Sequence, residues 1–138
     1  MERVTGIGGV FFRAQNPVAL AQWYHEHLGI TPTPSNYDVR PWQQQAGPTV
    51  FQPFPADTQY FGDARLVWMV NFRVRDLDAL VTQLRDAGVD VTVDLRVYPN
   101  GRFARLHDPE GNAFEQWQPE GRDGQMTTTL AGTAGPGA

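Results

Sequence analysis

The chain has 138 residues, of which 41% are hydrophobic, and this is enough for one domain with a core. Its formal net charge of −4 and the absence of a Lys/Arg run exclude a typical nucleic-acid-binding protein, and the absence of cysteine excludes disulfides and thiolate chemistry. No apolar run approaches the ~20 residues of a membrane span, and the N-terminus lacks a signal-peptide pattern. We therefore expect a cytoplasmic protein without a membrane or nucleic-acid partner.

The segment NPVALAQWYHEHLG, residues 16–29, has the pattern of a helix with both ends marked. Asn16 is a suitable N-cap, Pro17 suits the first helical position, and Gly29 follows the end. Side chains at helical spacing predict one buried face, made of Leu20, Trp23, Tyr24, His27 and Leu28. We expect His27 to be a hydrogen-bonded residue at the edge of the core.

The segment DLDALVTQLRDAG, residues 76–88, repeats this plan with Asp76 as its N-cap. Each predicted helix, at about 16–28 and 76–87, follows a β-prone stretch. At an offset of 60 residues (72 − 12) the caps, apolar stripes and strand residues match, as in Phe12 and Phe72, Arg13 and Arg73, Ala19 and Ala79, and Leu20 and Leu80. The sequence therefore predicts an internal duplication of one strand–helix–strands unit.

Turn residues separate several predicted strands. GGVFFRA, YDVRPWQQQ and TVFQPF belong to the first half, and LVWMVNFRV, VDVTVDLRVY, RFARLH and AFEQWQP belong to the second. PADTQYFGDA is expected to be the loop that links the halves. We predict one domain at 1–119, with units at about 4–60 and 64–119, and a flexible C-terminal tail at 120–138, which is rich in Gly, Thr and Ala.

Two βαβββ units in tandem, the second ending in DPEGN and a strand that carries Glu115, resemble the vicinal oxygen chelate superfamily. This superfamily includes glyoxalase I, bleomycin-resistance proteins, extradiol dioxygenases and fosfomycin-resistance enzymes. The resemblance covers about residues 4–119, and DPEGNAFEQWQP is its most specific part. It implies an α+β fold in which two half-barrels form a cup. It also implies a homodimer, in which the half-barrels close within one chain or between two.

Metal-binding members of that superfamily place ligands on inward-facing strand positions, which fall here on Gly9, Gln52, Met69 and Glu115. A stable divalent site needs roughly three or four converging donors. Gly9 has no side chain, Met69 offers a soft thioether, and Gln52 is a weak neutral donor. We therefore expect no metal cofactor. No Ser/His/Asp spacing stands out, and His107 is expected at the rim of the cup.

Alternation along the strands predicts which side chains face the cup. Glu115 shares a face with Ala113 and Trp117, and without a metal its carboxylate must pair or be protonated. Arg13 and Arg73 are the candidate partners, either in a structural ion pair or at the polar end of a ligand site. The predicted ligand-binding residues are Phe11, Arg13, Gln52, Phe54, Asn71, Arg73 and Trp117, although Phe11 and Trp117 are equally consistent with core packing.

The preferred function is metal-independent binding or sequestration of a small organic molecule in an aromatic-lined cup. The alternative is a lyase, isomerase or dioxygenase of the same superfamily that uses Glu115 as a base or metal ligand. An interaction module is a third interpretation, but it leaves the polar inward positions without a purpose.

Overall fold

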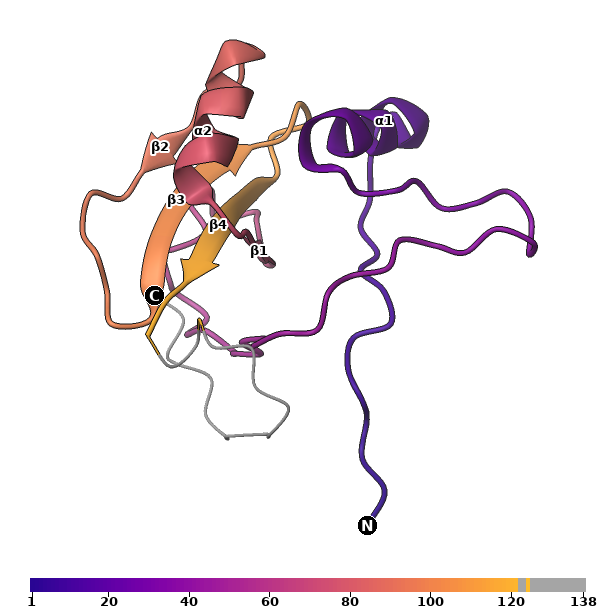
Figure 1. Ribbon diagram of the computed structural model, residues 1–138, viewed down its shortest axis with the longest axis horizontal. Coiled ribbons are helices and arrows are strands. Elements are labelled where there is room, and N and C mark those ends of the chain that lie inside the picture. Colours follow the sequence, from indigo (N-terminus) through magenta and orange to yellow (C-terminus); the bar gives the residue numbers. More distant parts are fainter. Residues whose placement is uncertain (122–123, 125–138) are drawn as a thin grey trace.

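The sheet and one helix are built from the second half of the chain (Figure 1). The computed structural model describes residues 1–121 and 124. The sheet has the order β1-β4-β3-β2, with β1 parallel to β4 and the other neighbours antiparallel. In chain order the elements are α1 (Pro17–Leu28), β1 (Val70–Arg73), α2 (Leu77–Asp86), β2 (Thr92–Val93), β3 (Gly101–His107) and β4 (Ala113–Pro119). This α+β arrangement confirms the predicted fold class.

Both helices begin where their caps predict. The Oδ1 of Asn16 accepts a hydrogen bond from the N–H of Ala19 at 3.1 Å, and Asp76 does the same for Ala79 at 3.0 Å. These bonds satisfy one of the free N–H groups at each helix start. Gly29 ends α1 in the left-handed conformation at φ 72°, which glycine adopts without a steric cost. The two predicted helices are confirmed to within one residue at each end.

The main core lies between the helices and one face of the sheet, here called the helix face. Leu77, Val81 and Leu84 of α2 pack there against Ala104, Leu106 and Phe114. From α1, the rings of Trp23 and Tyr24 lie 6.3 and 5.7 Å from that of Phe114. The predicted apolar stripes of both helices are therefore confirmed, and Trp23 also contacts the ring of His27 at 5.0 Å.

One polar residue is buried on this helix face. Gln116 follows Phe114 by two residues in β4, pairs in register with Phe72 and Ala104, and is fully buried. Within residues 1–121 and 124, no hydrogen bond reaches its side-chain amide. A buried amide without a partner lowers the free energy of unfolding by roughly 1–3 kcal/mol.

The DPEGN turn connects α1 to the sheet. The buried carboxylate of Asp108 accepts four hydrogen bonds, from the N–H groups of Glu110 and Asn112, the amide of Asn112 and the hydroxyl of Tyr24. The Glu110 carboxylate accepts the N–H of Asn16 at 3.0 Å and that of its predecessor Gln15 at 2.6 Å. Glu110 therefore holds the start of α1, where a carboxylate also suits the positive end of the helix dipole, while Asp108 holds the helix further along through Tyr24.

The strand predictions for the first half are wrong for this chain. Residues 1–16 and 29–69 contain no strand, and the segment before α1 runs away from the sheet (Figure 1). A strand requires backbone hydrogen bonds to a neighbouring strand, and within residues 1–121 and 124 the segments 1–15 and 31–69 make no backbone–backbone hydrogen bond to another segment. Many of their large apolar side chains are consequently exposed, among them Val4, Ile7, Val10, Phe11, Phe12, Tyr37, Val39, Trp42 and Phe51. The duplication is present in the helices and their caps but not in the strands.

In the second half, the strand predicted at VDVTVDLRVY is much longer than the one in the structure. β2 keeps Thr92 and Val93, after which Asp94 accepts hydrogen bonds from the N–H of Arg96 and the hydroxyl of Tyr98. The N–H of Asp94 still donates to the carbonyl of Phe103 at 3.0 Å, and the local turn that follows ends the regular strand. The predicted flexible tail at 120–138 lies almost wholly outside the described residues.

Candidate functional site

Three polar side chains form a row across the face of the sheet opposite the helices, here called the open face. Asn71 of β1 and Arg105 of β3 both pair in register with Glu115 of β4. Trp117 and Phe103 form the next row on the same face. The prediction that Glu115 shares a face with Ala113 and Trp117 is therefore confirmed. Glu115 is 6% exposed, so its carboxylate needs partners.

The carboxylate of Glu115 is paired by two neutral donors. Its Oε2 accepts the hydroxyl of Tyr60 at 2.5 Å, and its Oε1 accepts the side-chain amide of Asn71 at 2.8 Å. The predicted partners Arg13 and Arg73 are not among its hydrogen-bond donors in the described part of the chain. Glu115 is therefore satisfied by a phenol and an amide, and neither of them supplies an opposite charge.

Tyr60 belongs to the loop that links the halves, and sequence reasoning missed it. Its ring stacks on Phe54 at 5.4 Å with an interplanar angle of 27°, and the guanidinium carbon of Arg105 lies 4.5 Å from its centroid. Burial and the hydrogen bond to Glu115 raise the pKa of Tyr60 well above its ordinary value, although Arg105 acts in the opposite direction. At neutral pH, Tyr60 is a neutral phenol that donates to Glu115.

Arg105 has no carboxylate partner within 4.0 Å among residues 1–121 and 124, and its guanidinium lies over the ring of Tyr60. A guanidinium stays charged at all ordinary pH values and offers five N–H donors. It is therefore the cationic group of the open face that remains available to an incoming molecule. Its position follows from the hairpin register around DPEGN, which places Arg105 opposite Glu115, so the sequence contained a signal for it.

Arg73 has a structural role instead. Its guanidinium donates to the carbonyl oxygens of Gln45 at 2.6 Å and Pro48 at 2.7 Å, and to the hydroxyl of Thr49 at 3.3 Å. A Cβ at Gly47 would lie 2.9 Å from its Cζ, so the missing side chain there makes this approach possible. Burial lowers the pKa of Arg73, but its charge persists. Arg73 holds a first-half segment against the sheet.

The remaining predicted site residues separate into two groups. Trp117 is 2% exposed, donates from Nε1 to the carbonyl of Asn100 at 2.8 Å and stacks on Phe103, so it belongs to the packed part of the open face. Phe11, Arg13 and Gln52 are exposed on segments that contain no strand. The structure thus brings together Phe54, Asn71 and Glu115, adds Tyr60 and Arg105, and leaves three predicted residues apart.

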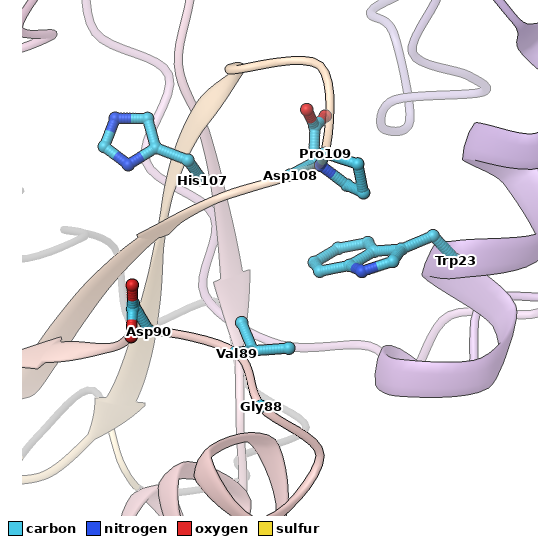
Figure 2. A pocket seen from close by; sticks show the side chains of 7 residues that line it. All are labelled: Trp23, Gly88, Val89, Asp90, His107, Asp108 and Pro109. Carbon is cyan, nitrogen blue, oxygen red and sulfur yellow. The ribbon is translucent and has the colours of Figure 1, made fainter.

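A separate cavity of about 320 Å³ lies between α1, the segment after α2 and the end of β3 (Figure 2). It is lined by Trp23, Gly88, Val89, Asp90, His107, Asp108 and Pro109. Asp108 cannot serve a ligand there without losing the bonds that hold the DPEGN turn. His107 is exposed, and Asp90 is the other acidic residue of the lining. The expected position of His107 at the rim of a cup stays a prediction. We regard Glu115 and its partners as the stronger candidate site.

A comparison with models of protein families identifies the family of this chain. Residues 9–116 match the family model described as a glyoxalase-like domain, and this range is most of the sequence. The chain belongs to the glyoxalase-like domain family. This membership confirms the resemblance to the glyoxalase and bleomycin-resistance proteins that the DPEGN strand suggests.

Three relatives of this glyoxalase-like domain are informative in different ways. The anthracycline biosynthesis protein DauV of Streptomyces sp. (strain C5) is 36% identical over 70 residues, which are 50% of this chain and 26% of that protein. The chain thus spans about a quarter of the length of this curated relative. A glyoxylase/bleomycin resistance protein/dioxygenase domain from Frankia sp. EAN1pec has a TM-score of 0.52 at 15% identity, covers 86% of this chain and 100% of its own, and shows the fold. The antibiotic binding protein TnmS3 from Streptomyces sp. CB03234 is 32% identical over 40% of this chain and 46% of its own, with a TM-score of 0.36.

The donor set of a metal centre does not fit this glyoxalase-like domain. Of the four positions where related proteins place ligands, Gly9 offers no side-chain donor and Gln52 is exposed on a segment without a strand. Among residues 1–121 and 124, no three His, Cys, Asp or Glu side chains converge closely enough to hold a metal ion. A separate point concerns membranes: residues 1–121 and 124 contain no helix that is long and apolar enough to cross one.

Proposed function

We propose that this glyoxalase-like protein binds or sequesters a small, partly aromatic organic molecule on the open face of its sheet, without a metal. The observation that carries the proposal is the group formed by Glu115, Asn71, Tyr60 and Arg105. It combines a buried acceptor, an amide and a guanidinium that has no carboxylate partner in the described part of the chain, and the phenol of Tyr60 covers them. A few convergent polar groups beside aromatic rings are the usual composition of a small-molecule site.

The electrostatics of this group favour a ligand with both polar and aromatic parts. Arg105 can receive an anionic or carbonyl oxygen, and the exposed amide of Asn71 has a second N–H to offer. Phe54 and Phe61, whose rings lie 5.2 Å apart beside Tyr60, supply apolar surface. The 70-residue similarity to a protein of anthracycline biosynthesis supports an organic molecule as the ligand.

The proposal is tested by titrating aromatic probes into the purified protein and two variants. Arg105→Met removes the available charge, while Arg75→Met removes an exposed arginine that forms no hydrogen bond or ion pair with residues 1–121 and 124. We expect probes that raise the melting temperature of the wild type to lose most of this effect in Arg105→Met and to keep it in Arg75→Met. Equal effects of the probes on all three proteins would refute a site at Arg105.

An enzyme that uses Glu115 as a base is the second candidate, and the burial of this carboxylate favours it. A buried carboxylate in a ligand site is a suitable acid or base. In this role Glu115 would take a proton from the substrate at the oxygen now bonded to Tyr60, so Tyr60 would have to move. Turnover of a probe that disappears in Glu115→Gln while the probe still binds would favour this candidate over sequestration.

We also propose that the functional form is a homodimer. The support is the large number of exposed apolar side chains in the first half, including Val10, Phe11 and Phe12, on extended segments without backbone partners. A second copy of the chain offers both apolar surface and strand edges. Sedimentation velocity should therefore give twice the monomer mass, and a monomer at about 100 µM, far above the dissociation constant of a stable dimer, would contradict the proposal.

A further inference from the structure

We infer that the phenol of Tyr60 and a hydroxylated aromatic ring of the ligand compete for the same place against Glu115, so that the ligand binds by displacing Tyr60. This inference rests on the proposed function and narrows it to a ligand class. It also assigns Tyr60 as a residue that opposes binding, whereas a residue of the site wall would promote it.

The first support is the way the Tyr60 loop is attached. Residues 55–65 form short turns, whose backbone bonds run from Thr58 to Pro55 and from Gly62 to Gln59. Tyr60 joins this loop to the sheet through its hydrogen bond to Glu115 and its contact with the guanidinium of Arg105. The loop contains no helix or strand, so it can leave the sheet without breaking regular structure.

The second support is that each contact of Tyr60 would recognise any phenol. The hydroxyl meets a carboxylate oxygen, while the ring meets the face of Phe54 and the guanidinium of Arg105. Glu115 and Arg105 belong to paired strands and stay in place when the loop moves. The surface beneath Tyr60 is therefore already shaped for a ring that carries a hydroxyl group.

The third support is the chemistry of the acceptor. An ionised carboxylate accepts hydrogen bonds but cannot donate them, so the group that replaces the Tyr60 hydroxyl must be a donor. An aryl methyl ether has the same ring and oxygen but no proton to donate. A site built around a buried hydrogen bond rejects such an analogue strongly, since the acceptor is left without a partner.

Competition with Tyr60 weakens the apparent affinity of the ligand. When the competent state is a small fraction of the protein, the apparent dissociation constant rises by the reciprocal of that fraction. Removing the phenol should remove this penalty. The direction of the effect separates a competitor from a wall residue, whose loss would weaken binding.

The experiment uses 2-naphthol and 2-methoxynaphthalene as matched probes, with dissociation constants measured by isothermal titration calorimetry. The proteins are the wild type, Tyr60→Ala, Tyr60→Phe and, as a control, Tyr37→Ala, which alters a fully exposed tyrosine. Tyr60→Phe keeps the ring and removes the hydrogen bond, so it serves if Tyr60→Ala does not fold. A double variant, Tyr60→Ala with Glu115→Gln, tests the acceptor.

We expect Tyr60→Ala to bind 2-naphthol about tenfold more tightly than the wild type, with a several-fold gain in Tyr60→Phe and no change in Tyr37→Ala. The preference for 2-naphthol over its methyl ether should fall in the double variant. Weaker binding of 2-naphthol by both Tyr60 variants would overturn the competition. Equal affinity for the two probes in every protein would overturn the ligand class while leaving the proposed function standing, and no binding of either probe to any protein would reject both.

Discussion

The two halves of the chain carry similar sequence signals but reach different degrees of order. Residues 70–119 form a sheet with a covering helix and a core whose leucines are fully buried. Residues 1–69 form one helix, and their extended segments remain without backbone partners. Caps and apolar stripes therefore specify a helix locally, whereas a strand also depends on the segments that lie beside it.

The second half holds the first half partly through polar side chains. Asp108 accepts the hydroxyl of Tyr24, Glu115 accepts that of Tyr60, and Arg73 donates to two backbone carbonyls. Both tyrosines belong to the first half, and both carboxylates belong to the second. The contact between the halves therefore depends on protonated phenols as well as on the aromatic packing of α1.

The largest expected effect is a loss of stability on truncating a core leucine, and it should differ between α2 and α1. Leu84→Ala in α2 removes a fully buried side chain from the main core and should lower the free energy of unfolding by about 2–5 kcal/mol. Leu20→Ala in α1, which is buried outside that core cluster, should cost less. Urea denaturation of both variants measures the difference, and equal losses would show that the two halves share one cooperative core.

A smaller effect is expected at the contact between Tyr60 and Glu115. Glu115→Leu leaves the Tyr60 hydroxyl and the Asn71 amide without their acceptor, and should lower the free energy of unfolding by about 1–3 kcal/mol. If Glu115 instead balanced a buried arginine, the stranded charge would raise the loss to about 3–5 kcal/mol. Chemical denaturation of Glu115→Leu beside Glu115→Gln, which keeps one acceptor oxygen, distinguishes these cases.

A stabilising substitution is predicted within the second half. Gln116→Met keeps the length of the side chain, removes the buried unpaired amide and should raise the free energy of unfolding by about 1 kcal/mol. Gln118→Met is the matched control, because the Oε1 of Gln118 accepts the N–H of Leu77 at 2.7 Å, and this bond would be lost. Destabilisation by both substitutions would mean that Gln116 has a partner in the folded protein.

The smallest effect is expected from alkaline pH. Burial, followed by the hydrogen bond to Asp108, raises the pKa of Tyr24 well above its ordinary value of about 10, and Tyr60 is shifted in the same direction. Because the unfolded chain loses these protons first, the contribution of the two tyrosines to stability should be constant below about pH 10 and fall as the pH rises further. Denaturation at pH 8 and pH 10.5 measures the fall, which Tyr24→Phe should reduce and Tyr37→Phe should leave unchanged.

Sequence reasoning predicted the features that depend on neighbours along the chain. The caps Asn16 and Asp76 locate both helices, and alternation after the DPEGN turn places Glu115 and Trp117 on one face. It failed where the outcome depends on distant segments. Tyr60 lies in an irregular loop with no periodicity to place it.

The arginines show the same dependence on segments that are distant in the sequence. Their matching positions in the repeat gave no indication that Arg73 would bind backbone carbonyls or that Arg13 would remain exposed. Arg105, in contrast, followed from the hairpin register and was overlooked. The fold was therefore more predictable than the partners of its polar groups.

The hydrogen bonds from Arg73 to the backbone of residues 45–48 have a consequence for the variability of this segment. Because the guanidinium binds the carbonyl oxygens of Gln45 and Pro48, almost any side chain at these two positions preserves the contact, and Gly47 alone must stay small. The segment can therefore change its chemical character while its backbone stays beside the sheet. A library that randomises positions 45 and 48 would be a practical starting point for redirecting this scaffold toward new molecules.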